Sequence, residues 1–241
     1  QGDWNDLYAW NLATDDLGWH HFQFNAPIVW NGADNLVIEF AQDNTSEGAD
    51  YTHLATDVAN ESVVHTSGED SYVDFNWFDE VKVPGEAFAE MDEQVTVSFW
   101  LYGDPDVQPQ NGTTFEGGNA SNQRVLNSHT PWSNSNVYWD AGWDGGYDRI
   151  NTGANAEDFE GRWNHWAFTK NTASGIMTIY LNGEQWLSGA DRDNPLSGIV
   201  EFSIGAATTW DNYYSGFMDE FQIWNTALDA ETISSWLYRD V

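Results

Sequence analysis

The stretch RWNHWAFTKNTASGIMTIYLNGEQW, residues 162–186, decides the fold class. Apolar and polar residues alternate in both of its halves, around Trp166 and around Ile179, which is the period-two pattern of half-buried strands. The polar segment NTASG separates the halves, and Gly175 within it tolerates a positive φ. Asn182-Gly183 then favours a tight hairpin turn. The stretch therefore predicts consecutive antiparallel strands.

A second stretch, SGFMDEFQIW at residues 215–224, predicts a closing strand, because Phe217, Phe221 and Ile223 alternate with other residues. The segment NTALDAETISSWL follows. Asp229 is placed to cap the N-terminus of a short helix that buries Ile233, Trp236 and Leu237 on one face. The order strand, hairpin, strand, helix is typical of a β-sandwich.

These segments resemble the laminin-G-like, concanavalin-A-like lectin and glucanase superfamily in its bacterial jelly-roll form. The resemblance is carried by a Trp-x-His-x-Ala-x-Thr strand, an Ile-Tyr-Leu-Asn-Gly turn and a closing Gly-x-Met-Asp-Glu strand. The matching residues are Trp163, His165, Ala167, Thr169, Ile179–Gly183 and Gly216–Leu228. Gly68–Val73 and Val95–Leu101 resemble the opening strands, so that the similarity extends over residues 55–241.

The resemblance implies an all-β, concanavalin-A-like sandwich with one short C-terminal helix. It is less informative on function, because this fold includes lectins, adhesins, carbohydrate-binding modules and hydrolases. Trp100, Trp166 and Trp224 lie within the strand patterns, and we expect them in the core.

Charge and composition narrow the classes of partner. The chain of 241 residues has 39 acidic and 7 basic residues, for a net charge of −32. Such a chain repels nucleic acids and anionic lipids. It has no cysteine, which excludes disulfides and thiol chemistry. We find no hydrophobic run of membrane-spanning length and no signal peptide, and the opening QGDWND is compatible with a mature piece of a larger secreted protein.

Three explanations of the acidic charge remain open. One is solubility in a salty medium, where screening weakens self-repulsion. Another is the binding of a cation such as calcium, which prefers carboxylate and carbonyl oxygens. The last is a basic partner. A marine or halophilic protein, secreted or held at the cell surface, would combine the first two.

The N-terminal residues 1–50 differ in character from the sandwich predicted over residues 51–241. The segment GWHHFQFNAPIVWNGADNLVIEF reads as strand, turn and strand. It is either the remnant of a neighbouring β-domain or a set of extra strands attached to the main sandwich. The polar segment 42–50, QDNTSEGAD, marks the boundary.

Aromatic residues gather in predicted loops and at strand ends. An exposed Trp or Tyr ring can stack on the apolar face of a pyranose, while neighbouring polar side chains bond its hydroxyls. The long segment Gly103–Gln123 reads as a loop. The aromatic candidates are Trp132, Trp143, Tyr147, Trp210, Tyr213 and Tyr214, and their polar neighbours include Asp148, Arg149 and Asp211. The alternative is that several of these rings only cap the sandwich.

Asp219 is the metal candidate, because the resemblance implies a structural calcium ligand in the closing strand. Its partners would be Glu69 or Asp70. The alternative is a strand-edge carboxylate that faces water or bonds backbone amides.

Catalysis has weak support. Glu86 and Glu90 have the spacing of a glycosidase carboxylate pair, but they lie in a turn-like acidic segment. The sequence therefore predicts a secreted, non-catalytic module that binds a polysaccharide or other glycan, with calcium, and that can belong to a larger secreted protein. The alternatives are a calcium-dependent adhesion or protein-interaction domain and, with less support, a polysaccharide hydrolase.

Overall fold

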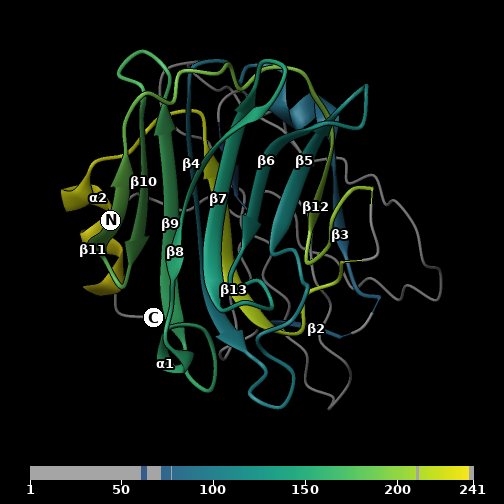
Figure 1. Ribbon diagram of the computed structural model, residues 1–241, viewed down its shortest axis with the longest axis vertical. Coiled ribbons are helices and arrows are strands. Elements are labelled where there is room, and N and C mark those ends of the chain that lie inside the picture. The colour runs from purple at the N-terminus through teal and green to yellow at the C-terminus, as the bar shows by residue number, and fades with distance from the viewer. Residues whose placement is uncertain (1–60, 64–71, 77, 210–211, 239–241) are drawn as a thin grey trace, which may run out of the picture. The chain divides into compact units, whose positions relative to one another are not determined.

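The computed structural model describes residues 61–63, 72–76, 78–209 and 212–238. In these ranges the strands form two antiparallel sheets that pack as a jelly-roll sandwich (Figure 1). The predicted all-β, concanavalin-A-like class is confirmed. The predicted strands of residues 1–50 lie outside the described residues, so the two alternatives for that segment stay open. No helix in the described part of the chain is long and apolar enough to cross a membrane.

Among the described residues, one sheet has seven strands and the other has six. The seven-stranded sheet contains, in spatial order, β1 (Glu61–Val63), β13 (Gly216–Trp224), β4 (Gln94–Gly103), β9 (Asn164–Asn171), β10 (Ile176–Leu181) and β11 (Glu184–Gly189), with β2 (Val73–Phe75) also paired to β13. The six-stranded sheet contains β3 (Val81–Pro84), β12 (Ile199–Ile204), β5 (Phe115–Asn119), β6 (Arg124–His129), β7 (Asn136–Trp143) and β8 (Tyr147–Gly153).

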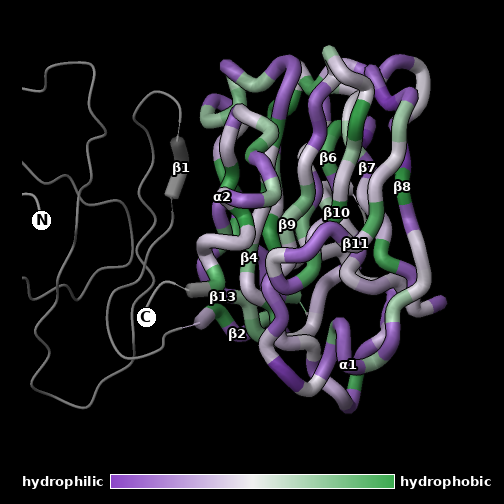
Figure 2. The backbone as a smooth tube through the Cα atoms, turned by 90° about the vertical axis from the view of Figure 1, so that its left-hand side faces the viewer, coloured by the Kyte–Doolittle hydropathy of each residue, from purple (hydrophilic) through white to green (hydrophobic). Residues whose placement is uncertain are grey.

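The helices are short. They are η1 (Gly85–Phe88), α1 (Ala156–Phe159), α2 (Ala230–Ser235) and η2 (Trp236–Tyr238). Asp229 accepts a hydrogen bond from the backbone N–H of Thr232, and Ile233 is buried. The predicted N-cap is therefore confirmed. Figure 2 shows α2 and β8 on opposite sides of the sandwich.

Aromatic residues from both sheets fill the core. The rings of Phe115 and Trp139, from the six-stranded sheet, approach that of Phe168 on β9 to 6.0 and 5.6 Å between centroids. Trp139 also donates its indole N–H to the backbone carbonyl of Thr169 at 3.1 Å, which satisfies the polar end of a fully buried ring. Trp166 is fully buried as predicted. The core thus joins the two sheets directly.

The predicted hairpins are present. Asn182 and Gly183 connect β10 to β11 and both adopt positive φ, at 50° and 76°. Gly175 closes the β9–β10 turn with φ at 65°. Both turns fall where the sequence places them, and β9, β10 and β11 pair in the predicted order, with one register shift between β10 and β11 at Ile179 and Tyr180.

Two predictions about tryptophan burial were wrong. Phe99 and Leu101 point into the core, so the period of two turns Trp100 to the outer face, where its ring meets that of His165 at 5.3 Å. Trp224 is likewise only half-buried and stacks on Trp236. Both tryptophans pack on the outside of the seven-stranded sheet.

The segment Gly103–Gln123 is not entirely a loop, because its second half contains β5. Gly117 has no side chain, and a Cβ there would lie 3.1 Å from side-chain atoms of both Ile199 and Phe202. The glycines that suggested a loop therefore allow a strand to pass close beneath apolar side chains of β12.

Candidate functional site

The side of the six-stranded sheet that faces away from the core carries a row of polar side chains, one on each of β5, β6, β7 and β8. Directly paired residues point to the same side of a sheet. Strand pairing aligns Arg149 with Asp140, Asp140 with Asn127 and Asn127 with Glu116. The core-facing residues Trp139 and Ile150 alternate with these positions. We call this surface the polar face and define it by Glu116, Arg124, Asn127, Tyr138, Asp140, Tyr147 and Arg149.

Asp140 is the centre of an ion-pair network. Its carboxylate is fully buried and accepts hydrogen bonds from two guanidinium groups. Arg149 donates one hydrogen bond from Nε to Oδ1 and a second from Nη2 to Oδ2, the second at 2.7 Å. Arg124 donates a hydrogen bond from Nη1 to Oδ2 at 2.9 Å. Bidentate pairing of this kind fixes the plane of a guanidinium group. The hydrogen bond to Asp140 raises the pKa of Arg149, which stays cationic.

Glu116 extends the network across β5. Its Oε2 accepts hydrogen bonds from Arg124 Nε at 2.9 Å and from Asn127 Nδ2 at 3.1 Å. Its Oε1 accepts from the backbone N–H and the hydroxyl of Thr208. The Oδ1 atom of buried Asn127 has no hydrogen-bond partner among the described residues. Hydrogen bonds thus fix the buried side chains of the polar face, while the Asn127 Oδ1 acceptor stays without a partner among the described residues.

Two tyrosine rings flank Arg149. Its guanidinium carbon lies 4.7 Å from the Tyr138 ring centroid and 4.8 Å from that of Tyr147, within the range of cation–π attraction. Tyr147 is 39% exposed. Hydrogen bonds from the amides of Asn134 and Asn136 fix the Tyr138 hydroxyl and lower the pKa of Tyr138. No hydrogen bond among the described residues uses Nη1 of Arg149.

This arrangement combines flat apolar surfaces with fixed donors and acceptors. Such a combination suits a ligand that has an apolar face and several hydroxyl groups, since stacking and hydrogen bonding act at adjacent points. The side chains are held before a ligand arrives, which reduces the entropy lost on binding.

The structure places the sequence-predicted aromatic residues in two groups. Tyr147 belongs to the polar face, and Trp143 lies 6.4 Å from it between ring centroids in the β7–β8 hairpin. Trp132 precedes β7, and its ring packs against that of His129 in a tilted arrangement at 4.5 Å between centroids. Seven residue steps along β7 separate these two ends by about 23 Å. Trp132 and Trp143 therefore cannot contact one sugar ring together.

The late aromatic segment lies near the Trp132 end. Tyr213 packs against Phe78 at 5.4 Å between ring centroids, and the neighbouring Asn212 accepts a backbone hydrogen bond from Thr113. Tyr214 is fully buried, so its predicted exposure was wrong. Trp210 and Asp211 lie outside the described residues, and their role stays a prediction.

Asp148 points away from the polar face. Strand alternation separates it from Arg149, and its Oδ2 accepts hydrogen bonds from Lys170 Nζ at 2.8 Å and from the backbone of Asn194 at 2.9 Å. Lys170 is fully buried and also donates to the backbone carbonyl of Ala141. Burial lowers the pKa of Lys170, and the bond to Asp148 partly offsets this effect. The pair links the two sheets.

Of the predicted calcium ligands, only Asp219 lies among the described residues. Asp219 lies on β13, and its Oδ1 accepts the backbone N–H of Glu220 at 2.7 Å. Its predicted partners Glu69 and Asp70 lie outside the described residues. Within the described ranges, no group of three or more His, Asp or Glu side chains is arranged to hold a metal ion. Calcium binding at Asp219 therefore stays a prediction.

The polar face also contains residues that the sequence-based prediction missed: Glu116, Arg124, Asn127, Tyr138 and Asp140. The available signal was the alternation in Val137–Ala141, where Asp140 lies between two strongly core-like residues. A carboxylate in such a strand needs a cationic partner. That partner comes from β6 and β8, and only the strand pairing identifies it.

Two buried histidines predict a loss of stability in mild acid. Burial lowers the pKa of both His129 and His165 from 6.5 to about 4. Because the folded state then binds fewer protons than the unfolded state between these values, stability is complete above pH 6.5 and falls toward pH 4. Each histidine contributes up to about 1.4 kcal/mol per pH unit. Urea unfolding at successive pH values measures this slope, and an unchanged slope in the His129→Gln/His165→Gln variant would contradict it.

Comparison with known proteins agrees with this architecture. A family model of the concanavalin A-like lectin/glucanases superfamily matches residues 75–234. No curated protein sequence matches the chain.

Solved structures of botulinum neurotoxin domains share the fold. The receptor-binding domain of the C/D mosaic serotype is 16% identical, with a TM-score of 0.54 over 78% of this chain and 44% of that one. The serotype G binding domain is 14% identical, with a TM-score of 0.54 over 73% and 46%. The serotype D ligand-binding domain in complex with N-acetylneuraminic acid is 19% identical, with a TM-score of 0.53 over 78% and 44%. The chain spans less than half of each of these domains.

Proposed function

The chain belongs to the concanavalin A-like lectin/glucanases superfamily, and from this membership we propose that it is a non-catalytic carbohydrate-binding module that acts outside the cell or at its surface. One observation carries the proposal. Arg149 is fixed by Asp140 and lies against the rings of Tyr138 and Tyr147, so that stacking surfaces and a fixed cationic donor adjoin. The glycan ligand of the serotype D neurotoxin domain supports the same class of ligand.

The carboxylates of the polar face support binding rather than hydrolysis. Glu116 and Asp140 each accept hydrogen bonds from arginine, so their oxygens are engaged in the side-chain network of the sheet. Glu86 lies in the short helix η1 and Glu90 follows it, and both are exposed. A glycosidase needs one carboxyl group that can donate a proton and a second that acts opposite it.

A glycan array with fluorescently labelled protein tests the proposal. We expect saturable binding to one class of polysaccharide, and no release of reducing ends from the polysaccharides that bind. Absence of binding to any glycan, with or without calcium, would contradict carbohydrate recognition. Product release from a bound polysaccharide would instead identify a hydrolase.

A second candidate is a protein-interaction or adhesion module. The observation that favours it is an aromatic cluster on the outer face of the seven-stranded sheet, formed by Tyr72, Tyr102, Trp163 and Phe217. Tyr72 and Trp163 are substantially exposed, and exposed apolar clusters often mark contact surfaces. Loss of partner binding in Trp163→Ala, with glycan binding absent from the unaltered protein, would support this alternative.

Calcium binding at Asp219 belongs to the proposed function and has its own test. If Asp219 holds calcium together with residues outside the described ranges, a chelator lowers the melting temperature, because a ligand bound only by the folded state stabilises it. Asp219→Asn then lowers the melting temperature in calcium and removes the effect of the chelator. Glu184→Gln, an exposed carboxylate on β11, is the matched control. A melting temperature of the unaltered protein that is insensitive to chelator would contradict the prediction.

A further inference from the structure

We propose that the aromatic cluster on the outer face of the seven-stranded sheet binds an extended, arginine-bearing segment of a protein partner. The proposal goes beyond carbohydrate binding, because it concerns the sheet opposite the polar face. It also names the chemistry of the partner that a contact surface around Tyr72 and Trp163 would take.

Strand pairing and strand alternation place the cluster on one surface. Tyr102 on β4 pairs with Phe217 on β13, and Trp163 directly precedes β9, which is the next strand of the sheet. Leu101 and Met218 are buried in the core, so alternation turns their neighbours Tyr102 and Phe217 outward. Figure 2 shows β2, β13 and β4 on the same side of the sandwich as α2. The cluster therefore covers neighbouring strands of one sheet.

The four rings support one another and remain accessible. The ring centroid of Tyr72 lies 4.5 Å from that of Phe217 and 5.8 Å from that of Trp163, and the centroids of Tyr102 and Trp163 are 5.9 Å apart. Tyr72 is 50% exposed and Trp163 is 37% exposed. These mutual contacts restrict the rings before a partner arrives, which reduces the entropy lost on binding.

Carboxylates border the cluster. Asp74 on β2 is exposed and pairs with Phe217, so that both side chains lie on the same side of the sheet. At the end of β4, Gly103 forms a bridge with Glu160. Glu160 therefore lies beside the strand end that carries Tyr102. The border of the cluster is acidic on two sides.

The border has little positive charge to balance these acids. Arg162 is next to Trp163 in the chain, and its Nε donates a hydrogen bond to the backbone carbonyl of Glu157 at 2.7 Å. Within the described ranges, Asp74 and Glu160 form no salt bridge with lysine or arginine. The net charge of −32 on the whole chain acts in the same direction. Charge complementarity therefore favours a cationic partner.

The polar face shows how this chain accommodates a guanidinium group. There, Arg149 lies against the rings of Tyr138 and Tyr147 and pairs with the carboxylate of Asp140. In the described part of the chain, no lysine or arginine lies over a ring of the aromatic cluster, because the cation–π contacts all fall on the polar face. The cluster offers rings and carboxylates without a cation. An arginine of a partner supplies it, since a guanidinium plane stacks on an aromatic face and pairs with a carboxylate.

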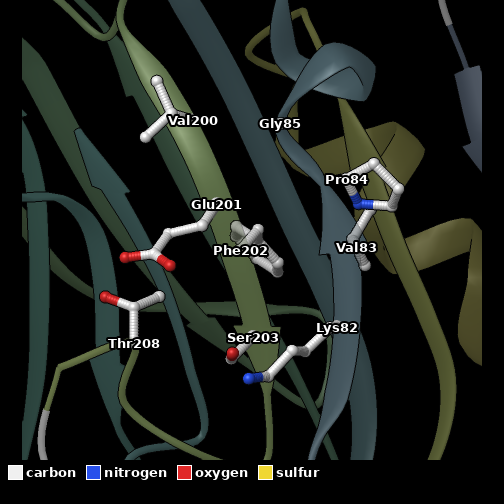
Figure 3. Close-up of a pocket in the computed structure, with 9 residues that line it drawn as sticks. All are labelled: Lys82, Val83, Pro84, Gly85, Val200, Glu201, Phe202, Ser203 and Thr208. Carbon is white, nitrogen blue, oxygen red and sulfur yellow. The ribbon is translucent and has the colours of Figure 1, made fainter. Parts of the chain in front are cut away.

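The hollow between β3 and β12 is less suitable for a cation. Figure 3 shows the Lys82 side chain extending past Ser203, with the Glu201 carboxylate farther along β12. Lys82 is 75% exposed and pairs with Glu80 at 3.1 Å. An arginine that enters this hollow meets an exposed lysine, and repulsion offsets its attraction to the carboxylates. We therefore expect a basic segment to prefer the aromatic cluster.

The size of the surface fits a short extended segment. From Asp74 to Trp163 the surface crosses β2, β13, β4 and the start of β9, and three spacings of about 4.8 Å give a length of about 14 Å. An extended peptide covers this length with about four or five residues, and its alternate side chains point to the same side. Arginines at alternate positions can therefore reach the rings and the bordering carboxylates together.

Fluorescence anisotropy with labelled peptides tests the proposal at an ionic strength of about 0.15 M, where long-range attraction is screened. The probe is a peptide of alternating arginine and threonine. It is compared with versions that carry lysine, or the neutral isostere citrulline, at the arginine positions. We expect saturable binding of the arginine peptide, binding of the lysine peptide that is weaker by about fivefold or more, and no binding of the citrulline peptide.

Variants on the two sheets locate the contact. Trp163→Ala should weaken binding of the arginine peptide by about tenfold or more, and Asp74→Asn by about threefold. Tyr72→Ala tests a second exposed ring. The matched controls are Val200→Ala and Glu201→Gln, which remove an exposed apolar side chain and an exposed carboxylate from β12 on the other sheet. Both controls should leave the affinity unchanged, and thermal unfolding checks that each variant is folded.

Equal affinity for the arginine and lysine peptides would identify general attraction to the negative chain and overturn the proposal. An equal loss of affinity in the β12 controls, or no binding of the arginine peptide, would overturn it as well. None of these results bears on carbohydrate binding, which the glycan array tests separately.

Discussion

Replacing Asp148 by alanine is expected to lower the free energy of unfolding by about 3–5 kcal/mol, because it leaves a buried charge without its partner. Lys170 is fully buried, and its ammonium group has Asp148 and the carbonyl of Ala141 as its hydrogen-bond acceptors. Denaturant unfolding monitored by tryptophan fluorescence measures the change.

The control is Asp144→Ala, which removes an exposed carboxylate from the β7–β8 hairpin and should change stability by less than about 0.5 kcal/mol. The double variant Lys170→Met/Asp148→Asn should recover much of the lost stability, because a well-packed apolar replacement removes the unpaired charge. Equal stability of the Asp148 and Asp144 variants would show that the buried pair does not stabilise the sandwich.

The same pair predicts a pH effect with a definite sign. The pKa of Lys170 is lower in the folded protein than in the unfolded chain. The unfolded state therefore binds more protons just below pH 10.5, and stability contributed by this group increases as pH rises toward that value. Without Asp148 the pKa of Lys170 falls further, so the increase should begin at a lower pH in Asp148→Ala.

Replacing Tyr147 by alanine is expected to weaken glycan binding by about tenfold or more, while stability changes by less than about 1 kcal/mol. The ring is 39% exposed and lies over Arg149 and Arg124. Its removal takes away a surface on which a sugar ring can stack. It also removes one of the two tyrosine rings that contact the Arg149 guanidinium group. Titration with a polysaccharide that binds the unaltered protein gives the affinity, and thermal unfolding gives the stability.

Trp163→Ala is a matched control, because Trp163 is 37% exposed but belongs to the aromatic cluster on the other sheet. It should leave glycan affinity unchanged. The reverse pattern, with affinity lost in Trp163→Ala and retained in Tyr147→Ala, would place recognition on the seven-stranded sheet. Arg149→Lys keeps the charge but loses the bidentate geometry with Asp140, so it should also weaken binding.

The polar face differs in its charge balance from the chain as a whole. Glu116 and Asp140 are balanced by Arg124 and Arg149, although acidic residues outnumber basic ones by 39 to 7 in the whole chain. Two of the seven basic residues are therefore placed at this one network. The glycan ligand that we propose would meet fixed, paired charges there rather than the net negative field of the whole chain.

The sequence by itself determined the elements whose signals are local. The alternation around Trp166, the Asn182-Gly183 turn and the Asp229 cap each depend on a few adjacent residues and on backbone preferences. Each appears in the structure where it was predicted. The same local pattern proposed Tyr147 and Arg149 together, and their side chains are adjacent in space as well as near in sequence. Their role in binding stays a prediction.

Only the tertiary structure decided which of the remaining candidates share a surface. Asp148 and Arg149 are neighbours in the chain, yet strand alternation sends one to a buried lysine and the other to the polar face. Glu116 and Asp140 are 24 positions apart and meet at Arg124 because β5, β6 and β7 pair in one register. Local sequence fixes which way a side chain alternates, whereas strand pairing across long separations fixes which side chains it meets.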